Sequence, residues 1–494
     1  MKQMIDYSSL QTVTATPEAS SMIETFRSIG YNIETAIADI IDNSISAEAK
    51  NIWINFEWLG TDTWLSIKDD GYGMNNEELI QAMRPGSKNP LEDRTDNDLG
   101  RFGLGLKTAS FSQARKLSVI SKKFDFNSVY WTWDLDYVNS TGKWELIRYL
   151  PNNDFLKEIE NQKTGTLVLW NDIDRLVKGF HQDDNKALDK FLAIMERIKL
   201  HLSMVFHKFI EQKRINIYFQ DQIVEPWNPF LINETSTQIF PEEKIQNGLV
   251  KIEGYILPHK SKLTPSQYKY AEGLKGWNEQ QGFYIYRKNR LLVAGDWLGL
   301  FRKEEHYKLT RIQIDLPNSL DEEWQLDIKK SKASPPLIYK EQLKAYAMKV
   351  RAKAVEVYRH RGKNVKPIVG QKFVPLWIDH KRGDKWFYKI NREHPILKET
   401  KNLVQNNPNK AIENLIRFIE ETIPTKSIFI KECEKPEEQG QPFEGSNQDI
   451  IKNLMTTMFN NLKTQGKDDD DAKAIILNIE PFNSFPHFIE LLSE

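Results

Sequence analysis

A segment with helical periodicity carries an unusual set of polar side chains. In IETAIADIIDNSISAEAK, residues 33–50, isoleucines gather on one face, and Asp39 and Asn43 lie four positions apart on the opposite face. This spacing places a carboxylate beside an amide. An amide oxygen is a hard ligand suited to Mg²⁺, and the carboxylate can position or deprotonate a water molecule. A capping or solvent-exposed role would use the same residue types, so the pair alone does not define a site.

The second candidate group is the loop DDGYGM, residues 69–74. Asp69 comes at the end of an expected strand, where its carboxylate can accept a hydrogen bond from an exocyclic amine. Gly71 and Gly73 permit positive φ and a close approach of the backbone to a planar ligand. A tight turn that binds nothing would also use this sequence.

The third candidate is the loop GRFGLGLKT, in which glycines at positions 100, 103 and 105 lead into a helix start. Backbone N–H groups and the positive end of the helix can cradle phosphate there, with Lys107 as a nearby charge. The loop is not a Walker A motif, and it does not follow a strand as a dinucleotide-binding fingerprint should. The sequence therefore argues against P-loop and Rossmann folds.

These motifs need a scaffold of helices and strands. A long loop over 84–104, rich in Gly, Pro, Asp and Asn, exceeds the length of a plain connector and is a candidate lid. Strands are expected at NIWINFEW, TWLSIKD, KLSVISK, SVYWTWDL and GTLVLWNDI. The pattern predicts an α+β domain with a mixed or antiparallel sheet that is covered by helices.

Composition excludes several classes of protein. The 494 residues contain a single cysteine, Cys433, which excludes an internal disulfide framework and a cysteine-based zinc site. No apolar run approaches the roughly 18 residues that span a membrane, and the N-terminus lacks the charged-then-apolar order of a signal peptide. We therefore expect a cytoplasmic protein with no membrane association.

Taken together, the three motifs and the later GTLVLW at 165–170 resemble the GHKL ATPase superfamily, which includes DNA gyrase B, MutL and histidine kinases. The run IADIIDNSISA…DDGYGM…MRPGSK…GRFGLGLKTAS most resembles its MORC-type members and their bacterial relatives. The resemblance implies a Bergerat fold, in which helices cover a mixed sheet and ATP·Mg²⁺ binds between them. A histidine kinase would need a phosphoacceptor histidine before these motifs, and the first histidine is His181.

The resemblance also implies roles for individual residues. Asn43 would hold Mg²⁺, and Asp39 would stand at the position of the general base, where relatives usually carry a glutamate that is one methylene longer. Asp69 would accept from the adenine N6 amine. The other nucleotide-binding positions implied by the resemblance are Gly71, Gly73, Met74, Ser87, Lys88, Arg101, Phe102, Gly103, Leu104, Gly105, Lys107 and Thr166.

A second domain is expected from residue 184 onward. Its strand-rich sequence resembles the S5-type transducer domain of MORC-like proteins, which implies that a basic side chain in LDIKKSKASPP contacts the γ-phosphate. Lys330 is the preferred residue, with Lys329 and Lys332 as alternatives, and a solvated basic turn is the competing interpretation. The expected divisions are an N-terminal segment 1–30, an ATPase domain 31–183, a transducer-like α/β domain 184–340, and a basic helix with a mixed C-terminal domain 341–494.

Charge is distributed unevenly along the chain. Residues 340–392 hold 15 Lys and Arg against 4 Asp and Glu, although the net charge of the whole chain is −1. Such an excess marks either a polyanion-binding segment or a solvated basic helix. The candidate DNA contacts are Lys349, Arg351, Lys353, Arg359 and Arg361.

Two functions are consistent with the sequence. The first is a slow ATPase that acts as a nucleotide-gated clamp, a homodimer in which ATP closes the lid and the protomers exchange their N-terminal segments. By fold-level analogy, its substrate would be DNA or a DNA-processing complex, with a nuclease or another defence protein as partner. The second is an ATP-sensing scaffold that hydrolyses ATP weakly or not at all, because Asp39 is short, and that recruits a protein partner.

Overall fold

The computed structural model describes residues 10–13, 15–86, 105–326, 333–359, 377–383, 385–393, 408–434, 449–477, 486–489 and 492. The chain divides into two compact units, 1–363 and 364–494. Within the described part of the chain, no helix has the length and apolar character needed to cross a bilayer.

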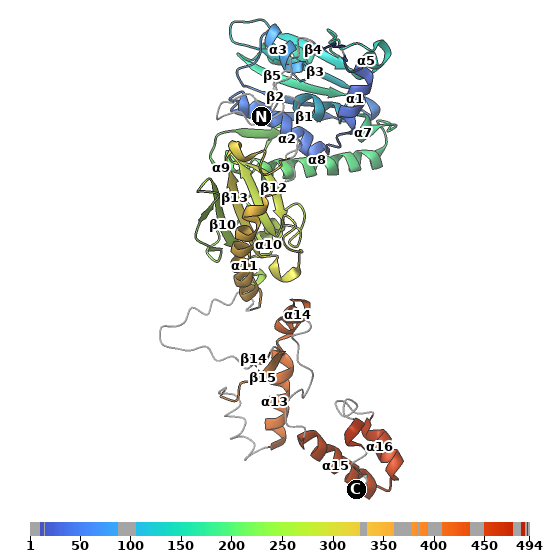
Figure 1. Ribbon diagram of the computed structural model, residues 1–494. Helices are drawn as coiled ribbons and strands as arrows, with labels where there is room; N and C mark the ends of the chain where they lie inside the picture. Colours follow the sequence, from blue (N-terminus) through green and yellow to red (C-terminus); the bar gives the residue numbers. More distant parts are fainter. Residues whose placement is uncertain are drawn as a thin grey trace. The chain divides into compact units, whose positions relative to one another are not determined.

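The first unit begins with a seven-stranded sheet (Figure 1). In spatial order, its strands are β4 (Val129–Asp134), β3 (Lys116–Lys122), β5 (Gly165–Asn171), β2 (Trp64–Asp69), β1 (Asn51–Glu57), β6 (Asn216–Phe219) and β7 (Gln222–Ile223). Neighbouring strands pair antiparallel except β1 and β6, which pair parallel. The expectation of a mixed sheet is confirmed.

Side chains alternate between the two faces of this sheet. On β5, Val168 and Trp170 join the main hydrophobic core, whereas Leu167 and Leu169 pack with α6 (Asp154–Glu160) on the other face. The longer helices of this domain and α4 contribute to the main core: α1 (Ala19–Ser28), α2 (Ile33–Ser46), α4 (Gly105–Phe111) and α8 (Asn185–Val205) (Figure 1). The short helices α3 (Asn76–Met83), α5 (Leu135–Thr141), α7 (Asp174–Val177) and α9 (His207–Glu211) also place residues in it. The first domain is therefore the expected α+β sandwich of helices on a sheet.

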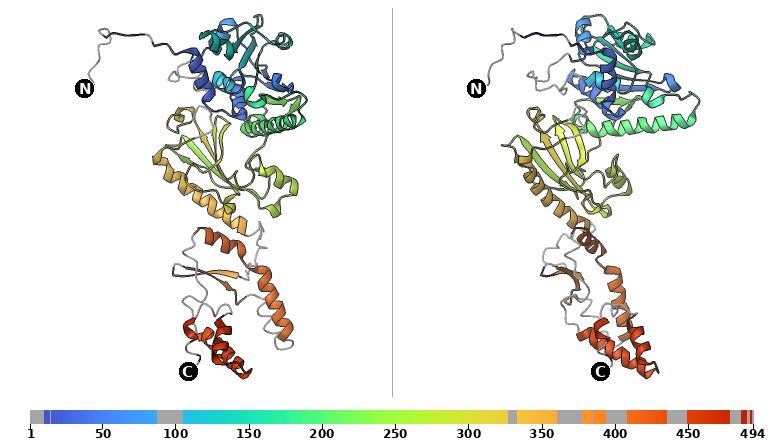
Figure 2. Two further views of the ribbon diagram at one scale, coloured as in Figure 1. Left: turned by 90° about the vertical axis from the view of Figure 1, so that its right-hand side faces the viewer. Right: turned by 45° about the vertical axis from the view of Figure 1, so that its right-hand side comes forward.

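The second part of this unit is built on another mixed sheet. Its strands follow the order β12 (Arg290–Asp296), β11 (Gly282–Arg287), β13 (Thr310–Leu316), β10 (Val250–Ile256) and β8 (Gln238–Ile239), and β9 (Glu243–Ile245) also pairs with β10. Helix α10 (Pro265–Glu272) starts with a Thr264–Gln267 capping box. Helix α11 (Leu337–Arg359) runs along this sheet (Figure 2).

Two segments lie in a different part of the fold from the one expected. INIYFQ, residues 215–220 within the expected domain 184–340, contains β6, which extends the first sheet by pairing with β1. The basic helix, expected to open the C-terminal region, packs on the second sheet because its Leu343, Ala347 and Val350 are buried in that core.

The second unit contains a short hairpin and several helices. The hairpin pairs β14 (Trp377–Arg382) with β15 (Lys385–Ile390). The longer helices are α13 (Pro408–Thr422), α14 (Thr425–Glu434), α15 (Asp449–Thr464) and α16 (Asp469–Leu477). Helices α15 and α16 share a core around Met455 and Ile476.

Candidate functional site

Helix α2 is positioned by a cap and by its isoleucines. The side chain of Asn32 accepts a hydrogen bond from the Thr35 amide (2.8 Å), which satisfies one of the free donors at the helix start. Ile37, Ile40 and Ile41 are fully or almost fully buried. This burial fixes the rotation of the helix and so determines where its polar side chains point.

The predicted pair on α2 is split between two environments. Asp39 is only 3% exposed, whereas Asn43 is exposed. The Asp39 Oδ2 atom accepts a hydrogen bond from the Tyr31 hydroxyl (2.9 Å), and its Oδ1 lies 3.5 Å from Nη2 of Arg290. The carboxylate at the general-base position is therefore held from two sides rather than open to solvent.

Asp42 has the tighter contact with the same arginine. Arg290 Nε lies 3.0 Å from both carboxylate oxygens of Asp42, and both side chains are buried. Sequence reasoning gave no role to Asp42, and it missed Tyr31 and Arg290. The sequence feature that could have indicated a buried role for Arg290 is its place at the start of the otherwise apolar run RLLVAG.

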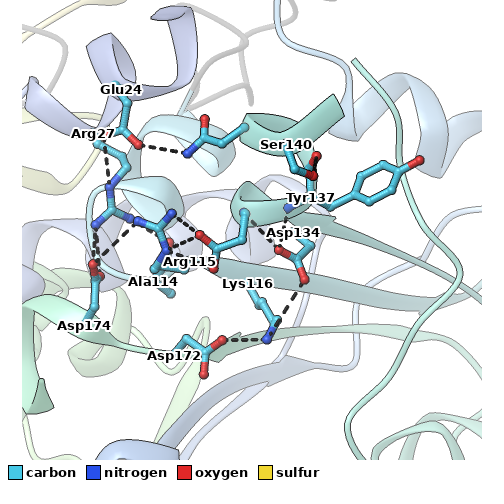
Figure 3. Close-up of polar contacts among 12 residues, drawn as sticks. Glu24, Arg27, Ala114, Arg115, Lys116, Asp134, Tyr137, Ser140, Asp172 and Asp174 are labelled. Carbon is cyan, nitrogen blue, oxygen red and sulfur yellow. Dashed lines mark hydrogen bonds and ion pairs between the residues drawn. The ribbon is translucent and has the colours of Figure 1, made fainter. Parts of the chain in front are cut away.

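Arg27 of α1 anchors this helix, which precedes Tyr31 and α2 in the chain (Figure 3). Arg27 donates to the carbonyls of Phe111 (2.9 Å) and Ala114 (3.2 Å), and to both carboxylate oxygens of Asp174 (2.9 and 2.7 Å). Arg27 is buried, as are Ile23 and Phe26 of the same helix. Helix α1 therefore belongs to the core of its own domain, and it ends three residues before Tyr31, which contacts Asp39.

Asp69 joins α2 to the glycine loop after β2. Its Oδ2 accepts a hydrogen bond from the Ser44 hydroxyl (2.8 Å), and its Oδ1 accepts from the Gly71 amide (2.9 Å). Burial raises the pKa of Asp69 to about 6, since a carboxylate removed from water is less stable in its charged form, although these two hydrogen bonds oppose the shift. Asp70 instead accepts from the backbone amides of Lys50 and Asn51 and so has a structural role.

The two glycines of this loop approach the protein's own backbone. A Cβ on Gly73, whose φ is +67°, would lie 1.9 Å from the carbonyl oxygen of Lys122. A Cβ on Gly71 would lie 2.7 Å from the carbonyl oxygen of Ala47. Chain packing alone therefore requires glycine at both positions, whichever ligand binds beside them.

A hydroxyl network connects the remaining predicted positions. The Ser121 hydroxyl on β3 accepts from the Met74 amide (2.8 Å) and lies 2.8 Å from the Thr166 hydroxyl. Thr166 stands directly opposite Asp69 in the β2–β5 pairing. The structure thus brings Asp69, Met74 and Thr166 together, with Ser121 as a link that sequence reasoning missed.

Lys107 lies on α4, whose first residue is Gly105. The lysine is 2% exposed, and its Nζ donates to the carbonyl of Ala82 in α3 (2.9 Å). A phosphate contact would require this lysine to give up or share that hydrogen bond. The predicted residues Ser87, Lys88, Arg101, Phe102, Gly103, Leu104, Lys329, Lys330, Lys332 and Arg361 lie outside the described residues.

The candidate DNA contacts of α11 are partly engaged within the protein. Lys349 pairs with Glu243 (3.1 Å), and Lys353 pairs with Glu356. The guanidinium of Arg351 lies 3.6 Å from the ring centre of Tyr307. The side chain of Arg359 lies outside the described part. Arg351 therefore contributes to packing on the second sheet.

An apolar cavity of about 680 Å³ lies beside α1 and β4, lined by Phe26 and by the tryptophans at 131, 133 and 144 among others. Of the described residues predicted to bind nucleotide, none lines it, whereas Arg84, Pro85 and Gly86 of the candidate lid do. The polar groups around Asp69 and Asp39, rather than this cavity, define the candidate site.

Comparison with known proteins shows which family the first domain is similar to. Residues 31–166 match the family model for histidine kinase-, DNA gyrase B- and HSP90-like ATPases. The chain is 34% identical over 89 residues to the ATPase morc-1 of Caenorhabditis elegans, which covers 18% of this chain and 10% of that protein.

Two bacterial proteins match as well. The DNA mismatch repair protein MutL of Buchnera aphidicola subsp. Schizaphis graminum is 29% identical over 127 residues, 25% of this chain and 22% of that protein. The chaperone protein HtpG of Rickettsia typhi is 35% identical over 108 residues, 19% of this chain and 17% of that protein. The chain thus spans less than a quarter of each of these relatives. Residues 31–166 are thus similar to GHKL ATPases, and the three relatives support that superfamily and a MORC-like relation for this segment.

Proposed function

We propose that the domain at 31–166 binds ATP with Mg²⁺ and hydrolyses it slowly. The observation that carries the proposal is the environment of Asp69, a buried carboxylate whose donors, Ser44 and Gly71, are neutral. Such a carboxylate is suited to accept a hydrogen bond from the exocyclic amine of adenine. The amine is a neutral donor like Ser44 and Gly71, so its binding brings no further charge into the buried site. Accepting from adenine is the role that the family resemblance implies for Asp69.

The other roles follow from α2. Asn43 lies on α2, the helix whose Ser44 donates a hydrogen bond to Asp69, and its amide is exposed. The amide oxygen is a hard ligand that suits Mg²⁺, and the ion would neutralise charge on the phosphates. Asp39 would take the proton of the attacking water, with Tyr31 and Arg290 fixing its orientation. Gly103, Gly105 and Lys107 would meet the phosphates, and Lys330 would reach the γ-phosphate.

A second candidate function is favoured by the contacts of Asp39. Its carboxylate is engaged by Tyr31 and Arg290 and is one methylene shorter than glutamate. A base held this way would be slow, and the protein would then act as an ATP-sensing scaffold that recruits a protein partner. The two functions share the binding site and differ only in turnover.

The cellular role is proposed at a coarser level. By analogy with its relatives, one of which is a DNA mismatch repair protein, the chain would work as an ATP-dependent homodimeric clamp on DNA or a DNA-processing complex in the cytoplasm, with a nuclease or another defence protein as partner. Lys349 and Lys353 remain the DNA contacts proposed on the described face of α11. Because α1 is anchored by Arg27, any exchange of N-terminal segments would involve residues before α1.

Neighbouring aspartates provide the test. ATP·Mg²⁺ binding is measured by titration calorimetry for the wild type, Asp69→Asn and Asp70→Asn. We expect the wild type and Asp70→Asn to bind ATP·Mg²⁺ with similar affinity, because the Asp70 carboxylate accepts hydrogen bonds from backbone amides at the start of β1. Asp69→Asn is expected to weaken binding at least tenfold, because any orientation of the amide turns a donor toward Ser44, Gly71 or the ligand. Equal binding by all three proteins would contradict the proposed site.

A further inference from the structure

The second sheet reaches helix α2 through a buried arginine. Arg290 opens β12 after a two-residue turn, Lys288 and Asn289, in which both residues have positive φ (49° and 71°). Such a turn matches the twist of the paired strands β11 and β12 and holds the start of β12 in a defined place. Arg290 is only 4% exposed.

The guanidinium divides its contacts unequally between two aspartates. Nε lies 3.0 Å from both oxygens of Asp42, whereas Nη2 lies 3.5 Å from Asp39. Nη1 donates to the carbonyl of Leu291 (2.9 Å), which fixes the group relative to its own strand. Asp42 is therefore the anchor for the arginine, and Asp39 is its looser partner.

This arrangement ties the two carboxylates to one cation. Breaking a buried ion pair costs free energy, so a shift of α2 away from β12 that separates Asp42 from Arg290 is opposed. Asp42 also directly precedes Asn43 in the helix. A displacement of β12 is thus transmitted to both Asp39 and Asn43.

We propose that Arg290 is a positioning residue that couples the second sheet to the nucleotide-binding helix α2, acting through Asp42. The inference rests on the proposed function, because the state it transmits is the nucleotide state of α2. When nucleotide binding moves α2, the start of β12 moves with it, and the β11–β12 hairpin reports that binding to the second domain.

Arg287 provides a matched control in the same hairpin. It is also buried to 4% exposure, and its Nη1 lies 3.0 Å from Asp321, a partner within the second domain. Arg287→Gln therefore removes a buried arginine and its ion pair from the hairpin while the Arg290–Asp42 contact is kept. Any effect of general destabilisation appears in both variants.

The experiment compares full-length wild type, Arg290→Gln, Arg290→Lys and Arg287→Gln. ATP·Mg²⁺ affinity is measured by calorimetry, and amide hydrogen exchange of residues 282–296 is measured with and without ATP·Mg²⁺. We expect ATP to slow this exchange in the wild type and in Arg287→Gln. Arg290→Gln is expected to bind ATP within threefold of the wild type, to show no ATP response in the hairpin, and to lose at least tenfold in kcat. Arg290→Lys should restore part of the response, because it keeps the charge without the planar fork.

The outcomes separate the inference from the function it rests on. A wild-type-like exchange response in Arg290→Gln overturns the coupling, and so does a wild type that binds ATP without any response in the hairpin. A wild type that binds no ATP contradicts the proposed function itself. If Arg290→Gln does not fold, Asp42→Asn replaces it: loss of the response with ATP still bound supports the inference, and a full response overturns it.

Discussion

Ser44 on α2 donates a 2.8 Å hydrogen bond to Asp69 at the end of β2, and this contact joins two motifs that lie 25 residues apart in the sequence. Asp69 in turn stands opposite Thr166 in the sheet. The helix with the candidate Mg²⁺ ligand and the strand with the candidate adenine acceptor are therefore joined directly to each other.

The titration of Asp69 should affect protein stability and ATP affinity in opposite directions: as the pH falls, stability should rise and affinity should fall. Because burial raises its pKa from 3.8 to about 6, lowering the pH from 7 to 5 adds a proton mainly to the folded protein. Its contribution to the free energy of unfolding therefore rises as the pH falls through 6 and is complete below 3.8. ATP affinity falls over the same interval, because the protonated carboxyl is a poorer acceptor for the adenine amine.

Calorimetry and thermal unfolding at pH 5 and pH 7 check this prediction. The Asp69→Asn variant should lose the pH effect on stability and keep only the part of the affinity change that comes from the titration of ATP itself, whereas Asp70→Asn should retain both effects in full. An equal pH dependence of affinity in wild type and Asp69→Asn would show that another group controls it.

Gly73 should be far less tolerant of a side chain than a glycine with the same backbone conformation. Gly73→Ala places a Cβ 1.9 Å from the Lys122 carbonyl oxygen, so the loop must move. Gly142, at the end of α5, has nearly the same φ (+65° against +67°) and no described atom within 4 Å of an added Cβ. We expect Gly142→Ala to cost about 1 kcal/mol and Gly73→Ala to cost at least about 3 kcal/mol in urea unfolding. Similar costs for the two would mean that the loop relaxes freely.

The buried ion pair between Asp42 and Arg290 should contribute much more to the free energy of unfolding than an exposed ion pair does. Asp42→Asn leaves the Arg290 guanidinium without its anchor, and removing one partner of a buried pair typically costs about 3–5 kcal/mol. Lys349→Gln removes a surface ion pair with Glu243, for which we expect about 0–1 kcal/mol. Urea unfolding of both variants against the wild type measures the difference, and a cost below 1 kcal/mol for Asp42→Asn would refute the anchoring role.

Site residues could be predicted from the sequence where the pattern that indicates them lies within a few neighbouring residues. The isoleucine periodicity placed Asp39 and Asn43 on one helix, and the strand before DDGYGM placed Asp69 at its end. Both elements are observed, as α2 and β2. Helix spacing and strand ends are properties of a few neighbouring residues, so one sequence suffices to find them.

The contacts that hold the site could not be predicted in the same way. Arg290 and Asp42 are 248 residues apart, and their contact depends on how the second sheet packs against α2. The addition of β6 to the first sheet depends likewise on a parallel pairing with a distant strand. The packing of the loop was also not predictable: a Cβ added at Gly71 or Gly73 would first meet a carbonyl oxygen of the protein itself.

The release of phosphate from ATP by wild type and Asp39→Asn, measured together with ATP affinity, tests hydrolysis at this site most directly. We predict slow but measurable turnover in the wild type, and at least a tenfold lower kcat in Asp39→Asn with ATP affinity changed by less than threefold. The reason is that the amide cannot take a proton from the attacking water. Turnover that is the same in both proteins would contradict the role of Asp39, and with it hydrolysis at this site.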